Sequence, residues 1–251
     1  MAKSETTGLE LEPGRVAGEV ERWARPLVDA LGDGFVAVYL YGSAADTDWD
    51  PSKSEANILL VAEALPSSAL QTLAAARPGR GPMGSEASIV LMPIDQLTRA
   101  TDTFALELAE VKYHGQLVLG RDVLAGLEIP DDSIRRHIER ELRLLVVRLR
   151  RAYLYGAGDK QALVAVLAEA GSELAVCARG LHFLLGARSP LPTESALNAA
   201  ADWAGVEPRA WIEAWRLHTE ASPPLAAADL YLDFLDAAMQ LLRRVDTHGE
   251  S

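Results

Sequence analysis

The fold is decided by the stretch Tyr39-Leu-Tyr-Gly-Ser-Ala-Ala-Asp-Thr-Asp-Trp-Asp-Pro-Ser-Lys-Ser-Glu-Ala-Asn-Ile-Leu-Leu-Val61. It starts inside the run 35–41, which is rich in β-branched and aromatic residues and predicts a strand. Gly42 and Ser43 end that strand, and residues 44–54 are predicted to form a polar loop. The apolar run 56–61 predicts a second, buried strand. The stretch therefore encodes a strand, a tight turn, a loop and a strand, with polar residues where the loop meets the second strand.

Glu55 and Asn57 are the polar residues at the start of that second strand. Side chains one residue apart on a strand point to the same face. Two carboxylates placed in this way can bridge divalent cations, which neutralise a triphosphate and activate an attacking hydroxyl. A Gly-Ser turn beside them lets a phosphate approach the backbone without a clashing side chain. The pattern favours phosphate chemistry, although an amide stands where a second carboxylate would be needed.

The same pattern resembles the nucleotidyltransferase superfamily, which includes the aminoglycoside nucleotidyltransferases. Its members have a strand ending in Gly-Ser, a loop of about ten residues, and two carboxylates separated by one residue before an apolar strand. Gly42 and Ser43 match the first element, Glu55 falls on the first carboxylate position, and Asn57 falls on the second. The resemblance covers roughly residues 15–120. More weakly, residues 104–112 and 118–120 and the helices beyond them look like an uncharacterised bacterial branch of the superfamily with a degenerate carboxylate motif.

The resemblance implies a site and a cofactor. Gly42 and Ser43 would bind the nucleotide, and Glu55, Asn57 and a third carboxylate would form the catalytic set. Glu86, which opens the apolar run 87–92, is the best candidate for the third carboxylate, ahead of Glu107. Any bound Mg²⁺ would be held by Glu55 and Glu86.

Asn57 leaves two interpretations of this site open. In one, the fold has lost catalysis because an amide carries no charge for Mg²⁺. In the other, Asp46, Asp48 or Asp50 reaches in from the loop and restores the charge.

The rest of the chain predicts an α+β domain followed by an all-α domain. The first domain, residues 13–129, would hold a small mixed sheet, with a further strand at 87–92, a short strand or turn at 116–119, and helices at 13–31, 67–76 and 95–112. The second, residues 130–246, would be a helical bundle. Its helices would run from Asp132 or Ser133 through Tyr153, from Asp159 to Gly186, and over 193–204, 207–219 and 224–245. Residues 1–12 and 247–251 would be loose tails.

Composition narrows the classes of partner. The formal net charge of −12 argues against a broad nucleic-acid-binding face. Seven arginines between positions 135 and 151 are then expected to form a solvated helix face rather than an RNA-contacting one. Cys177 is the single cysteine, so no disulfide forms within the chain. We find no signal peptide and no stretch of ~18 apolar residues, so a cytoplasmic location without membrane contact is expected.

Three functions remain open at this point. The first is a nucleotide-binding or regulatory protein with weak or no transfer activity. The second is an active Mg²⁺-dependent nucleotidyltransferase acting on a small molecule or a protein. The third is an interaction protein of the toxin–antitoxin type. In relatives the acceptor lies in the cleft between the two domains, so the resemblance implies a nucleoside triphosphate and an acceptor there.

Overall fold

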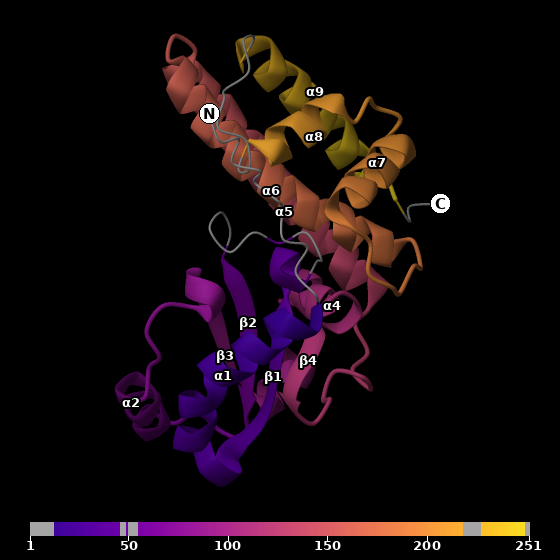
Figure 1. Ribbon diagram of the computed structural model, residues 1–251. Helices are drawn as coiled ribbons and strands as arrows, with labels where there is room; N and C mark the ends of the chain where they lie inside the picture. Colours follow the sequence, from indigo (N-terminus) through magenta and orange to yellow (C-terminus); the bar gives the residue numbers. More distant parts are fainter. Residues whose placement is uncertain (1–12, 46–48, 50–54, 218–226, 249–251) are drawn as a thin grey trace, which may run out of the picture. The chain divides into compact units, whose positions relative to one another are not determined.

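The computed structural model describes residues 13–45, 49, 55–217 and 227–248, and the chain forms two compact units (Figure 1). The first unit comprises the chain up to Ile94 together with Gly115–Asp122. The second comprises Asp95–His114 and the chain from Val123 onward. The contacts therefore do not follow a single cut near residue 130, because Asp95–His114 packs with the helices that come later in the chain.

The first unit is built on a four-stranded mixed sheet. Its strands are β1 (Phe35–Tyr41), β2 (Ala56–Ala62), β3 (Ala87–Pro93) and β4 (Gln116–Gly120), in the order β3-β2-β1-β4. β1 pairs antiparallel with both β2 and β4, whereas β2 and β3 are parallel. Parallel neighbours need a crossover, and the chain supplies one that contains helix α2 (Ser67–Ala75). The predicted small mixed sheet is confirmed.

Helix α1 (Pro13–Leu31) has the predicted bounds and covers one face of this sheet. Its apolar stripe, which includes Val20 and Leu27, packs in one core cluster with Leu40 of β1 and Ile58 of β2. Successive strand residues point to opposite faces. Residues that alternate with this buried set, Asn57 among them, therefore lie on the sheet face opposite α1.

The second unit is helical throughout its described part, apart from its turns and loops. Its helices are α3 (Ile94–Arg99), α4 (Ala105–Tyr113), α5 (Asp131–Gly156), α6 (Lys160–Leu184), α7 (Thr193–Ala204), α8 (Arg209–Arg216) and α9 (Ala227–Asp246). α6 packs against α4, α5, α7, α8 and α9, so it is the central helix of the unit. At Gly171 the backbone of α8 comes so close that a Cβ would lie 2.5 Å from the Trp215 nitrogen. The predicted α+β fold followed by a helical region is confirmed.

The composition of α6 contradicts our expectation that no segment of the chain is apolar enough to span a membrane. By length and composition this helix is apolar enough to cross a bilayer. In this structure its apolar side chains, such as Leu167 and Leu174, are fully buried against the neighbouring helices. The helix also carries Arg179 in its buried part, which is typical of a protein core helix with a paired charge.

The clearest differences from the predicted helices concern the segment 95–112 and the start of α5, while other helix ends, such as those of α8, differ by two or three residues. The segment expected to be one helix over 95–112 is two helices, separated by a turn over 100–104 in which Phe104 N donates to Ala100 O. The predicted cap of α5 at Asp132 or Ser133 is wrong, because the helix begins one residue after Pro130. Asp132 instead pairs with Arg135 and Arg136 on the first turns. The predicted cap Asp159 is confirmed, since its side chain accepts from two backbone N–H groups.

The sequence predicts loose tails at both ends of the chain, and these tails lie mainly outside the described residues. This applies to residues 1–12 and 249–251. Thr247 and His248 are described and continue the last turn of α9, where Thr247 N donates to Arg243 O and His248 N donates to Val245 O. The described backbone therefore continues this helical turn two residues beyond α9.

A buried ion pair joins three helices of the second unit. Arg179 Nε of α6 lies 2.7 Å from Glu110 Oε1 of α4, and both side chains are at most 5% exposed. Arg179 Nη1 also donates to Thr193 Oγ1 of α7 at 3.0 Å. Buried charges are tolerated when they are paired and hydrogen-bonded, so this contact fixes α4, α6 and α7 to one another.

Candidate functional site

The Gly42–Ser43 turn follows β1 directly and forms the first turn of a short 3₁₀ helix, Gly42–Ala45. Gly42 has φ of +69°, in the left-handed region that glycine adopts without strain. A Cβ at this position would lie 2.7 Å from Nδ2 of Asn57. Glycine is therefore required here twice over, by its backbone angle and by the close approach of the Asn57 amide.

Asn57 sits in the middle of a polar row that crosses the sheet. It pairs in register with Tyr41 of β1 on one side and with Ser88 of β3 on the other. Residues directly opposite each other in neighbouring strands share a face. The Asn57 amide therefore lies between a phenol and a hydroxyl, beside the Gly42 turn. Asn57 and Ser88 are both partly exposed.

Glu55 and Glu86 occupy equivalent positions, each one residue before its strand. The next residues, Ala56 and Ala87, are register partners, and Ala56 N donates to Glu86 O at 2.9 Å. Both glutamates are exposed. Parallel strands run about 4.8 Å apart, so two carboxylates start side by side at the edge that also holds Asn57.

The polar side chains at this corner of the sheet are not engaged in hydrogen bonds or ion pairs within the described chain. Among the described residues, Ser43, Glu55, Asn57, Glu86 and Ser88 make no side-chain hydrogen bond or ion pair with one another or with other described residues. Their hydroxyl, amide and carboxylate groups are thus available to a ligand.

A divalent metal fits this donor set only in part. Within the described ranges 13–45, 49, 55–217 and 227–248, no three His, Cys, Asp or Glu side chains come together as a metal site. The strand starts offer two carboxylates and one neutral amide, whereas Mg²⁺ sites are built on carboxylates, phosphates and water. Asp46, Asp48 and Asp50, the alternative source of charge, lie outside the described residues.

The weaker candidate Glu107 lies elsewhere, in the helical unit. Its carboxylate is 3.5 Å from Nδ1 of buried His137, and Glu141 lies 3.6 Å from Nε2 of the same ring. Leu106 N also donates to His137 Nδ1. These contacts tie α4 to α5, which gives Glu107 a place in helix packing.

The arginines of α5 are mostly neutralised, as expected for a solvated face. Arg135, Arg136, Arg140, Arg143 and Arg148 each pair with a carboxylate, in most cases on the same helix. Cys177 is buried as predicted, and burial raises the pKa of its thiol well above the ordinary value. Neither feature marks a reactive site.

The structure adds two polar residues that the sequence reading missed. Ser88 is one, and its signal was the two-residue spacing from Glu86, which puts both on one face of β3. The other is Asp122, just after β4, whose carboxylate accepts from the Tyr39 hydroxyl at 3.0 Å. Tyr39 shares the Asn57 face, two residues before Tyr41 on β1.

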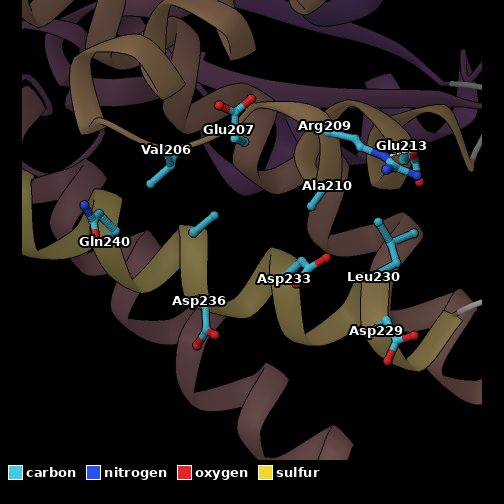
Figure 2. Close-up of a pocket in the computed structure, with 11 residues that line it drawn as sticks. Val206, Glu207, Arg209, Ala210, Glu213, Asp229, Leu230, Asp233, Asp236 and Gln240 are labelled. Carbon is cyan, nitrogen blue, oxygen red and sulfur yellow. Dashed lines mark hydrogen bonds and ion pairs between the residues drawn. The ribbon is translucent and has the colours of Figure 1, made fainter.

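A separate groove lies in the helical unit between α8 and α9 (Figure 2). It measures about 790 Å³ and is lined by Val206, Glu207, Arg209, Ala210, Glu213, Asp229, Leu230, Asp233, Asp236, Ala237 and Gln240. The lining is acidic, and its cation, Arg209, is paired with Glu213 at 2.7 Å. None of the residues predicted for the nucleotide site contributes to it.

Comparison with known proteins supports the fold. No protein-family model and no curated protein sequence matches the chain. Among solved structures, the chain is similar to spectinomycin adenyltransferase from Enterococcus faecialis, determined with ATP and spectinomycin. The two share 16% sequence identity and a TM-score of 0.51 over 89% of this chain and 97% of that one. The chain therefore has an aminoglycoside-nucleotidyltransferase-like fold.

Proposed function

We propose that this protein binds a nucleoside triphosphate at the Gly42–Ser43 corner of its sheet and transfers the nucleotidyl group weakly or not at all. The observation that carries the proposal is the position of Asn57. It stands in register between Tyr41 and Ser88, against the Gly42 turn, where the resemblance calls for a carboxylate. The corner would thus keep groups that can bind a nucleotide, while it carries one negative charge fewer than the resemblance implies.

The missing negative charge at residue 57 explains why the protein would bind a nucleotide but not transfer it efficiently. Nucleotidyl transfer builds negative charge on phosphate oxygens, and bound metals offset it. Those metals must be held by charges that the protein fixes in advance. Loss of one fixed electrostatic element typically lowers an enzymatic rate by about 10²–10³. Backbone N–H groups of a turn and neutral hydroxyl or amide groups can still contact phosphates.

The test measures binding and transfer separately. ATP, GTP, CTP and UTP are titrated into the protein by calorimetry, with and without Mg²⁺, and transfer of labelled nucleotide is followed in the same samples. ATP is the first choice because the similar adenyltransferase structure contains it, and spectinomycin is the first acceptor for the same reason. We expect measurable binding with turnover far below about 1 per second. Absence of binding for all four nucleotides would reject the proposal.

A matched pair of glycine variants locates the binding. Gly42→Ala introduces a Cβ at φ +69° and 2.7 Å from the Asn57 amide, so it should abolish binding. Gly79→Ala is the control, because nothing lies within 4 Å of its added Cβ and its φ is not positive. If Gly42→Ala bound nucleotide as wild type does, the corner would not be the site.

An active Mg²⁺-dependent transferase is the second candidate. It is favoured by the adjacent, exposed carboxylates of Glu55 and Glu86 at the starts of two parallel strands. Turnover at an ordinary enzyme rate, lost in Glu55→Gln and Glu86→Gln, would establish it in place of the first proposal.

A further inference from the structure

His137 of α5 caps the N-terminus of α4 from outside that helix. The first N–H groups of a helix have no acceptor within it, and Phe104, which precedes α4, supplies no side-chain cap. Nδ1 of His137 accepts a hydrogen bond from Leu106 N at 3.4 Å, so a ring nitrogen of another helix takes the place of the usual cap. An imidazole nitrogen accepts a hydrogen bond only while it carries no proton. This cap therefore requires an unprotonated Nδ1.

The same buried ring faces a carboxylate at each of its nitrogens. Glu107 Oε2 lies 3.5 Å from Nδ1, and Glu141 Oε1 lies 3.6 Å from Nε2. While Nδ1 accepts from Leu106, the proton of the neutral ring is on Nε2 and faces Glu141. A second proton would bind Nδ1, where it would oppose the Leu106 N–H and attract the Glu107 carboxylate. The two charge states of the ring thus hold α4 through different groups.

Glu107 is the carboxylate that is free to respond to this proton. It is 49% exposed and makes no other ion pair within the described part of the chain. The neighbouring charges on α4, α5, α6 and α9 are paired: Glu110 with Arg179, Arg135 with Glu139, Arg136 with Asp132, Arg140 with Glu141, and Arg143 with Asp246. On α6, which packs against Leu106 and Ile138 at Gly180, the Cys177 thiol stays neutral because burial raises its pKa.

We infer that His137 is a pH-dependent switch in the packing of α4 on α5: the neutral ring holds the Leu106 backbone, and the protonated ring holds the Glu107 side chain. Histidine side chains ordinarily change their charge between about pH 5 and pH 8, so the exchange of partners falls in the physiological range. α4 ends at Tyr113 and β4 starts at Gln116, so the switch acts on the segment that returns the chain to the sheet. The inference does not depend on the proposed nucleotide site.

Amide hydrogen exchange of the full chain, followed residue by residue by NMR, tests the release of the cap. After correction for the intrinsic exchange rate, the Leu106 N–H should lose roughly tenfold in protection from about pH 8 to about pH 5, the effect of losing one hydrogen bond. The reference is the Ala162 N–H, which the Asp159 carboxylate caps at 3.1 Å and which should keep its protection. His137→Asn places an acceptor that does not titrate near the position of Nδ1, so Leu106 should stay protected at both pH values.

Urea unfolding at the same two pH values tests the second partner. Glu107→Gln removes the carboxylate that receives the protonated ring, so it should lower the unfolding midpoint more in acid than at the higher pH. Glu194→Gln is the control, because Glu194 is similarly exposed, at 45%, and its partner Arg216 keeps its charge at both pH values. The control should therefore lower the midpoint equally at both.

Two outcomes would overturn the inference. If Leu106 in the wild-type protein is as protected in acid as at the higher pH, protonation of the ring does not release its N–H. If Glu107→Gln lowers the midpoint equally at both pH values, its carboxylate does not hold the protonated ring. Glu107 is half exposed, so Glu107→Gln should fold even where His137→Asn, at a buried position, does not, and circular dichroism checks both variants.

Discussion

Asn57→Asp is the substitution that tests most directly why the site would be inactive. Asp and Asn have the same shape, so the new side chain fits against Gly42 as the amide does. The only large change is one negative charge, added on the sheet face where Glu55 and Glu86 begin. If catalysis was lost at this residue, the variant should bind Mg²⁺ more tightly.

The expected gain in Mg²⁺ affinity depends on how exposed Glu55 and Asn57 are to water. Glu55 is exposed and Asn57 partly so, hence the dielectric constant of water is the conservative choice. A unit charge about 4 Å from a divalent ion then contributes about 2 kcal/mol, or about thirtyfold in affinity. The added carboxylate also stands about 7 Å from Glu55 along the strand, which costs the metal-free protein about 0.6 kcal/mol of stability. Mg²⁺ should restore that stability.

Two measurements and one control make the test decisive. Calorimetry gives the Mg²⁺ affinity with and without ATP, and thermal unfolding gives the stability in EDTA and in Mg²⁺. Gln71→Glu, on the exposed surface of α2, adds the same charge away from the site and should change neither quantity by much.

The reasoning fails if Asn57→Asp leaves the Mg²⁺ affinity within about twofold of wild type. That result would mean that residue 57 does not face a metal site, and the proposed lack of transfer would need another cause. It would also fail if wild-type protein already transferred nucleotide at about 1 per second or more.

Four further predictions concern single side chains. Leu142 is fully buried, so Leu142→Ala should lower the free energy of unfolding by about 2–5 kcal/mol in urea titration, and a loss under about 0.5 kcal/mol would contradict the packing of α5. Arg179→Met leaves Glu110 buried and unpaired and should cost about 3–5 kcal/mol, most of which a second change, Glu110→Leu, should recover. Burial raises the pKa of Tyr231 to about 12. The contribution of this shift to the free energy of unfolding is therefore complete below pH 10 and is lost as the pH rises towards 12. Tyr231→Phe should flatten this part of the profile of stability against pH, measured by denaturation. Ser88→Ala should weaken nucleotide binding several-fold in calorimetry, whereas Ser88→Thr, which keeps the hydroxyl, should not.

Most secondary structure could be predicted because it depends on local periodicity. The stripe of α1 and the apolar runs of β1 and β2 are visible in the sequence, and their bounds agree with the structure to within one residue. The turn over 100–104 was missed because no Gly or Pro marks it. The start of α5 was misplaced because Pro130 set the helix boundary where a side-chain cap was expected.

The site was harder to predict because it depends on register. The Gly-Ser turn and the pair Glu55 and Asn57 are neighbours in the sequence pattern. The position of Ser88 beside Asn57 depends on how β3 aligns with β2, which no local signal specifies. Likewise, Glu110 and Arg179 are 69 residues apart, and no local pattern in either helix predicts that the two side chains pair.

The sequence pattern also could not separate the two apolar sides of α5. Leu142 and Leu144 both belong to apolar stripes at helical spacing, yet one is fully buried and the other is half exposed. Periodicity reports which residues share a face, but the packing of other helices decides which face is covered.

The polar corner of the sheet is costly for a protein that has no use for it. Asn is a poor strand residue, and an apolar or β-branched side chain at Asn57 would suit β2 better. The two glutamates start side by side, just before their strands, with no cation of the described chain to separate them. Stability alone would favour replacing Asn57 and at least one of the two glutamates. Their presence beside the Gly42 turn is the observation that favours a ligand at this corner in our proposal. Binding without transfer, the function proposed above, would reconcile these two observations.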